Sequence, residues 1–68
     1  MPGRLLALGV TERETEVLRL AVKGLGNRQI AERMFLSPRT VEKHVERLLA
    51  KTGLRRDQLG TYSADLDT

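Results

Sequence analysis

The sequence predicts an all-α fold, a four-helix domain that contains a helix-turn-helix. Apolar residues recur at the three- and four-residue spacing of amphipathic helices in four successive stretches. Residues that favour helix starts precede the first three stretches, and glycines follow the first and the third. The chain has 68 residues and no cysteine, so one small domain must fold without disulfides.

The first predicted helix covers residues 11–23. Thr11 and Glu14 form the T-x-x-E pattern of a capping box, in which each side chain bonds the other's backbone amide. Gly24 follows the helix and suits a left-handed C-cap. The apolar stripe of this helix is Val17, Leu18, Ala21 and Val22. Residues 1–9 are expected to be a short opening segment, partly ordered through Leu5, Leu6 and Leu8.

The second predicted helix runs from residue 27 to about 34, with Asn27 as its N-cap. Ile30, Ala31 and Met34 give it one apolar face. Phe35 and Leu36 then lie in a tight connection, and because both are apolar we expect this turn to face the core.

Ser37 and Pro38 start the third predicted helix, which extends to about residue 51 before Gly53 stops it. Its core-facing side consists of Val41, Val45 and Leu48. A fourth helix is expected from about residue 57, although Gly60 weakens it by roughly 1 kcal/mol relative to alanine. Its stripe, Leu59, Tyr62 and Leu66, is expected to face water in part and to support weak dimerisation; the alternative is that it packs entirely onto the first and third helices.

Charge is distributed unevenly along the chain. Residues 1–56 hold all twelve Lys and Arg against six Glu, whereas the remaining residues hold three Asp and no base. A basic body favours a polyanionic partner such as nucleic acid, although a solvated surface explains such charge equally well. Residues 28–51 carry six of the bases: Arg28, Arg33, Arg39, Lys43, Arg47 and Lys51.

The third helix leaves a polar face opposite its core stripe. At 100° per residue, Arg39, Lys43 and Glu46 point away from the core, with Glu42 and Arg47 on the two flanks. Two short helices joined by a tight turn are typical of a helix-turn-helix, whose second helix enters the major groove. Arg and Lys there can address guanine, and Glu can accept from the amine of cytosine.

Four motifs in order extend this interpretation. They are T-E-R-E-x-E-V-L, G-L-x-N-x-x-I-A, L-S-P-R-T-V-E-K-H-V and L-x-K-T-G-L, all between Val10 and Leu54. Together they closely resemble the LuxR-type (GerE-type) helix-turn-helix domain of bacterial transcription regulators. The resemblance implies sequence-specific binding of double-stranded DNA, with a domain over residues 10–68, a helix-turn-helix over about 27–46, and an N-terminal regulatory domain in a longer protein.

The resemblance also implies roles for single residues. The base-reading candidates are Arg39, Glu42, Lys43 and Glu46. The phosphate-contact candidates are Asn27, Arg28, Thr40 and Arg47. His44 is a further candidate from its place in the third helix, where we expect it to lie at the edge of the core and to offer one ring nitrogen to a phosphate. The dimerisation candidates are Leu59, Tyr62 and Leu66, which imply a weak homodimer on an inverted repeat. Position 42 departs from the many relatives that carry Lys there, because its Glu side chain needs a cytosine amine or a neighbouring Arg to lie near phosphates.

Other functions find little support in the sequence. His44 is the single histidine, so neither a metal site nor a catalytic triad can be assembled around it, and we expect no enzyme activity, metal or cofactor. The chain has no apolar run long enough to span a membrane and no signal-peptide pattern, so a cytoplasmic location is expected. Two alternatives stay open: region 4 of a sigma factor, which shares the T-x-R-E-x-x-V-L opening, and a protein-interaction bundle.

Overall fold

The computed structural model describes residues 5, 7–62 and 66. Among these residues, three α-helices and a 3-10 helix have described bounds: α2 (Glu12–Val22), α3 (Asn27–Met34), α4 (Pro38–Thr52) and η1 (Arg56–Tyr62). Leu5, Ala7 and Leu66 are also helical. The described residues include no β-strand. The predicted all-α fold is therefore confirmed.

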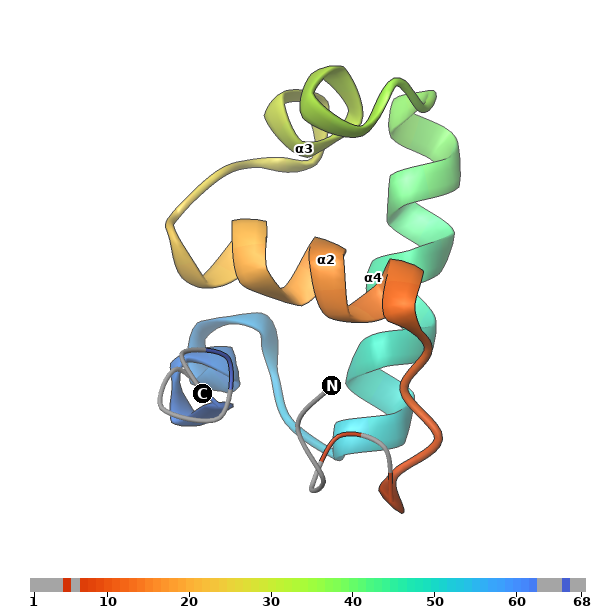
Figure 1. Ribbon diagram of the computed structural model, residues 1–68. Helices are drawn as coiled ribbons and strands as arrows, with labels where there is room; N and C mark the ends of the chain where they lie inside the picture. The colour runs from red at the N-terminus through yellow and green to blue at the C-terminus, as the bar shows by residue number, and fades with distance from the viewer. Residues whose placement is uncertain (1–4, 6, 63–65, 67–68) are drawn as a thin grey trace.

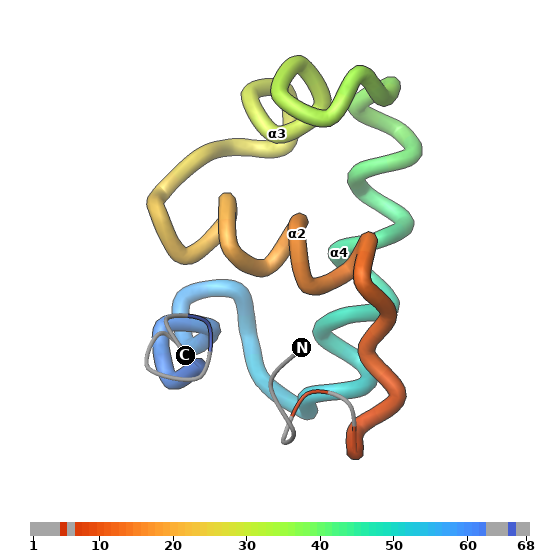
Figure 2. Tube along the Cα trace, viewed as in Figure 1, coloured from red at the N-terminus to blue at the C-terminus, as the bar shows by residue number. Residues whose placement is uncertain are grey.

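Helix α2 is the centre of the arrangement (Figure 1). It crosses α4 and contacts α3 on one side and η1 on the other. The tube in Figure 2 shows the same order, with α3 beside the N-terminal end of α4 and the blue C-terminal part of the chain beyond α2. This leaves α3 and the first half of α4 together at one end of the molecule, as a helix-turn-helix requires.

Two apolar clusters hold this arrangement together, and α2 contributes to both. Val17 belongs to the helix-turn-helix cluster, whereas its neighbour Leu18 belongs to the C-terminal cluster. The buried members of the helix-turn-helix cluster are Val17, Ile30, Ala31, Met34, Val41 and Val45. Those of the C-terminal cluster are Leu5, Val10, Leu18, Leu48, Leu59, Tyr62 and Leu66.

The helix ends predicted from local sequence largely hold. The backbone N–H of Glu14 donates to Thr11 Oγ1 at 3.2 Å, and the N–H of Thr11 donates to Glu14 Oε1 at 3.0 Å, which completes the capping box. Ser37 Oγ accepts from the N–H of Thr40 at 3.2 Å at the start of α4. Gly53 ends α4 at a φ of 70°, a left-handed conformation that glycine adopts without steric cost.

The start of α3 differs from the prediction by one residue. Its N-cap is Gly26, and Asn27 is the first helical residue. Gln29 explains the shift, because its Oε1 accepts from the backbone N–H of Gly26 at 2.9 Å and so fixes the cap there. The side chain of Asn27 is thereby free for another contact.

Of the two apolar residues in the turn between α3 and α4, one faces the core as predicted and the other does not. Phe35 is 95% exposed, so the prediction that it faces the core is wrong, whereas Leu36 packs against the helix-turn-helix cluster. Phe35 has a φ of 56°, and this left-handed residue reverses the chain at the end of α3. The reversal directs one apolar side chain outward and the next one inward.

The C-terminal stripe is buried within this one chain. Leu59, Tyr62 and Leu66 all lie in the C-terminal cluster, so the expectation that they face water in part is wrong, and the alternative arrangement describes them better. Residues 56–62 form a 3-10 helix rather than the expected α-helix. The part of these three residues in dimerisation stays a prediction.

The opening segment contributes to the same cluster. Leu5 is fully buried there and Val10 nearly so, whereas Leu8 is exposed. Leu6 lies outside the described residues.

Candidate nucleic-acid interface

The face of α4 opposite the core is charged and open to solvent. Val41, Val45 and Leu48 are buried on one side of this helix. The exposed residues on the other side are Arg39, Glu42, Lys43, Glu46 and Arg47. None of these five side chains forms a hydrogen bond or ion pair within the described part of the chain. Their charged groups are thus available to an external partner.

The remaining phosphate-contact candidates lie near helix starts or on one flank of α4. Arg28 is exposed on the first turn of α3, and Asn27 beside it is half-buried. Thr40 is half-buried, and its Oγ1 lies 2.9 Å from Ser37 Oγ in the first turn of α4. The hydroxyl of Thr40 is therefore already held by the helix cap.

His44 lies at the edge of the core, as the sequence suggested. The residue is half-buried, and its Nδ1 atom is buried with no hydrogen-bond partner among the described residues. Only Nε2 can then reach a partner outside the molecule. Its contact with a phosphate stays a prediction.

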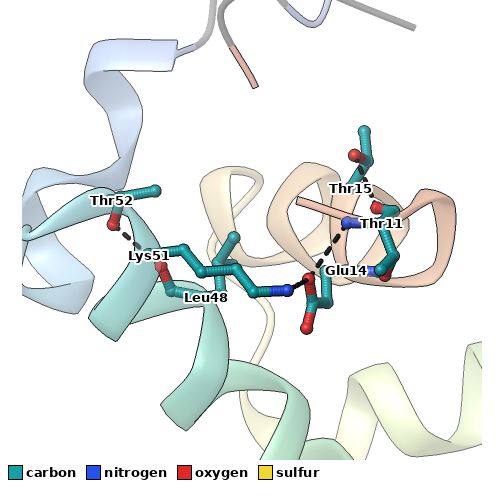
Figure 3. Close-up of polar contacts among 6 residues, drawn as sticks. All are labelled: Thr11, Glu14, Thr15, Leu48, Lys51 and Thr52. Atoms are coloured by element: carbon teal, nitrogen blue, oxygen red, sulfur yellow. Dashed lines mark hydrogen bonds and ion pairs between the residues drawn. The ribbon is translucent and has the colours of Figure 1, made fainter. Parts of the chain in front are cut away.

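Lys51 is not part of the charged face. Its Nζ donates to Glu14 Oε1 at 2.6 Å, a contact that joins α4 to the first turn of α2 (Figure 3). The Glu14 side chain is only 3% exposed and that of Lys51 is 30% exposed. Of the six bases in residues 28–51, five therefore remain for a polyanion.

Glu14 keeps its charge despite its burial. Burial alone raises the pKa of a carboxyl group, but the hydrogen bonds from Lys51 and Thr11, together with the positive charge of Lys51, outweigh it. The net effect is a pKa of Glu14 below its ordinary value of 4.5. The pair is thus an ionised link between α2 and α4 at neutral pH.

Arg56 is a residue that the sequence did not single out. From the start of η1, its Nη1 donates to Asn27 Oδ1, and its Nη2 donates to the backbone carbonyl of Leu25 at 2.9 Å. These partners lie about thirty residues away along the chain, at the beginning of α3. No local motif signals such a contact.

Neither a metal centre nor a membrane segment emerges within residues 5, 7–62 and 66. No three His, Cys, Asp or Glu side chains of this part gather where they could hold a metal ion. None of its helices combines the length and apolar character that crossing a membrane requires.

Comparison with known families decides which family the helices represent. The family described as "Bacterial regulatory proteins, luxR family" matches residues 9–59, which include all of α2, α3 and α4. The chain belongs to the luxR family. The resemblance carried by the four sequence motifs is thereby confirmed.

Two curated relatives are similar over most of this chain. The DNA-binding transcriptional activator DevR/DosR of Mycobacterium tuberculosis is 48% identical over 59 residues, which are 85% of this chain and 27% of that protein. The oxygen regulatory protein NreC of Staphylococcus aureus is 46% identical over 46 residues, 68% of this chain and 21% of that protein. This luxR-family chain thus spans about a quarter of the length of these relatives. No solved structure matches it.

Proposed function

We propose that this luxR-family domain binds double-stranded DNA sequence-specifically, as the effector domain of a bacterial transcription regulator. The observation that carries the proposal is the exposed charged face of α4, whose side chains have no ion-pair partner among the described residues, within a family helix-turn-helix. A helix fits the major groove, where long polar side chains near its N-terminal half reach base edges. The similarity to a DNA-binding activator supports the same function.

The candidate residues would make two kinds of contact with DNA, with base edges and with phosphates. Arg39, Glu42, Lys43 and Glu46 are the base-reading candidates. Arg47 lies to one side of the exposed face of α4, where the sugar-phosphate backbone of the duplex would lie. The other phosphate-contact candidates are Asn27, Arg28, Thr40 and His44. Phosphate contacts fix the register on the duplex, and base contacts supply the sequence preference. Glu42 would accept from a cytosine amine or pair with a neighbouring Arg.

Salt dependence of DNA binding tests the proposal. If the bases neutralise several phosphates, log K falls linearly with log salt by about 0.9 for each phosphate contacted. Lys51 should add nothing to the slope, because it is held by Glu14. The measurement is a fluorescence anisotropy titration of a labelled duplex at several salt concentrations.

Binding measurements of this kind also distinguish the proposed function from the two alternatives. A binding constant that does not change with salt concentration would exclude DNA as the partner. Reversal of charge at Arg39 and Lys43 would abolish DNA binding but would leave a protein-interaction bundle's partner binding unchanged. A sigma-factor fragment would need RNA polymerase to recognise its promoter, whereas this isolated domain should bind DNA alone.

Pairing of two domains would follow from binding to an inverted repeat. We expect a weak homodimer that forms on DNA, with half-sites about one helical turn apart, roughly 10 base pairs. The burial of Leu59, Tyr62 and Leu66 leaves little apolar area for a stable interface, so the domain should be monomeric in dilute solution. Sedimentation with and without a palindromic duplex measures this. A complex of one domain per palindrome at saturation would exclude the dimer.

The domain's place in a larger protein is also a proposal. It would act in the cytoplasm as a non-enzymatic DNA-binding unit over residues 10–68, with a helix-turn-helix over about 27–46, joined to an N-terminal regulatory domain. The longer relatives support this, since the chain matches only about a quarter of their length.

A further inference from the structure

Arg56 joins the last helix to the beginning of the helix-turn-helix. Its guanidinium group donates to two acceptors at once, Asn27 Oδ1 on the first turn of α3 and the carbonyl oxygen of Leu25 just before it. Both Arg56 and Asn27 are half-buried, so the contact lies at the edge of the surface. It connects η1 to a segment that otherwise contacts mainly α2 and α4.

The segment that Arg56 holds has little stiffness of its own. Gly24, with a φ of 93°, and Gly26 flank Leu25, and glycines leave a backbone free to adopt many conformations. The N-cap at Gly26 offers no side chain, and its local hydrogen bonds are that of its N–H to Gln29 Oε1 and that of its carbonyl from the N–H of Ile30, each at 2.9 Å. A guanidinium fork that binds a carbonyl and a side chain on either side of Gly26 restricts this freedom.

The contact also orients the amide of Asn27. An asparagine amide carries one accepting oxygen and one donating NH₂ group. Because Oδ1 accepts from Arg56, the amide is turned so that Nδ2 lies away from the guanidinium, and Nδ2 has no hydrogen bond within the described part of the chain. A phosphate oxygen only accepts hydrogen bonds, so Nδ2 is the half of this side chain that can bind it.

We propose that Arg56 is a positioning residue for DNA binding: it fixes the start of α3 and turns the Asn27 amide so that Nδ2 donates to a backbone phosphate. This inference rests on the proposed function. Arg56 acts through Asn27 and does not itself contact the phosphate. Helix η1, through its first residue, thus helps to set the geometry of the DNA-facing surface.

A double-mutant cycle tests whether Arg56 acts through Asn27. Arg56→Ala should weaken binding of a duplex about tenfold, because the charge-assisted hydrogen bond from Asn27 Nδ2 to the phosphate is lost. In the Asn27→Ala background the same change should cost less than about twofold, because the group it positions is gone. Arg55→Ala is the matched control. Arg55 is the neighbouring, exposed arginine, and within the described part of the chain its side chain pairs only with exposed Asp57, at 3.8 Å, so its loss should leave Asn27 untouched.

The salt slope separates positioning from direct contact. If Arg56 only positions Asn27, Arg56→Ala leaves the slope of log K against log salt unchanged. A slope reduced by about 0.9 would show that Arg56 binds phosphate itself. An undiminished tenfold loss in the Asn27→Ala background would show that Arg56 does not act through Asn27, and either result would overturn the proposal.

Asn27→Asp keeps the test independent of folding. Aspartate retains acceptor oxygens for Arg56, so the melting temperature should hold or rise, but it has no NH₂ to donate and binding should weaken about tenfold or more. Gln29→Glu adds the same charge two residues away and preserves an acceptor for Gly26, so it corrects for repulsion alone. An Asn27→Asp domain that binds no worse than Gln29→Glu would overturn the role of Nδ2. A wild-type domain that fails to bind any duplex would instead overturn the proposed function.

Discussion

Replacement of Lys51 by methionine is expected to lower the free energy of unfolding by about 2–3 kcal/mol at pH 7. Lys51 supplies the one cation bound to the buried carboxylate of Glu14 in the described structure. Hydrogen bonds to charged groups contribute about 1.5–3 kcal/mol, and removal of one partner leaves the other charge poorly solvated. Methionine keeps most of the apolar stem, so the loss reports the charge. For a domain this small, such a loss is a large part of the total stability.

Urea denaturation followed by circular dichroism measures this effect. Lys43→Met is the matched control, because Lys43 lies on the same helix but is exposed and forms no ion pair in the described part of the chain. We expect the control to stay within about 0.5 kcal/mol of wild type. A Lys51→Met domain as stable as this control would show that the pair does not hold α2 to α4.

The contribution of Glu14 should depend on pH in a defined direction. Its pKa is lowered in the folded protein, so the stability it adds is fully present above the ordinary value of 4.5 and is lost as pH falls through the folded pKa. The difference between wild type and Lys51→Met should therefore shrink below about pH 4.5. A difference that is constant down to pH 3 would contradict the assignment.

Local sequence predicts the position of Glu14 in a capping box, but not its ion pair with Lys51. The T-x-x-E pattern places Glu14 in a capping box because both partners lie in one helical turn. Lys51 is 37 residues away, and its pairing depends on how α4 crosses α2. The Arg56 contacts with Leu25 and Asn27 escape prediction for the same reason.

The sequence predicts which residues of α4 are exposed more reliably than it predicts the turn between α3 and α4. Helical periodicity alone places Lys43 opposite Val41 and Val45, since 100° per residue fixes which side chains share a face. Phe35 shows the limit of such reasoning. Its apolar character indicates burial, but a single left-handed residue at the end of α3 directs it into solvent.

The C-terminal stripe was ambiguous in the sequence. Leu59 and Tyr62 are three residues apart, a spacing that suits one face of an α-helix or of a 3-10 helix. The pattern also cannot tell an intramolecular partner from a second copy of the chain. Packing within the chain decides in favour of the first, because Leu59 and Tyr62 of η1 share the C-terminal cluster with Leu18 of α2 and Leu48 of α4.

The second large effect separates base reading from phosphate contact. Lys43 is exposed opposite the core stripe, one turn after Arg39, where a recognition-helix side chain should point into the groove. Lys43→Ala is expected to cost about 1–3 kcal/mol on the preferred site and to flatten the preference at one base position. Arg47→Ala should instead weaken preferred and random DNA alike and lower the salt slope by about one unit. Both residues lie outside the core, so circular dichroism should show both variants folded.

The most direct test of α4 as the recognition helix is selection of duplexes from a random pool by the wild-type domain and by Lys43→Ala. Affinities for the selected site are then measured for both proteins and for Arg47→Ala. We predict an enriched site whose preference at one base pair is lost in Lys43→Ala and kept in Arg47→Ala. Unchanged affinity and unchanged base preference in Lys43→Ala would contradict the placement of α4 in the major groove.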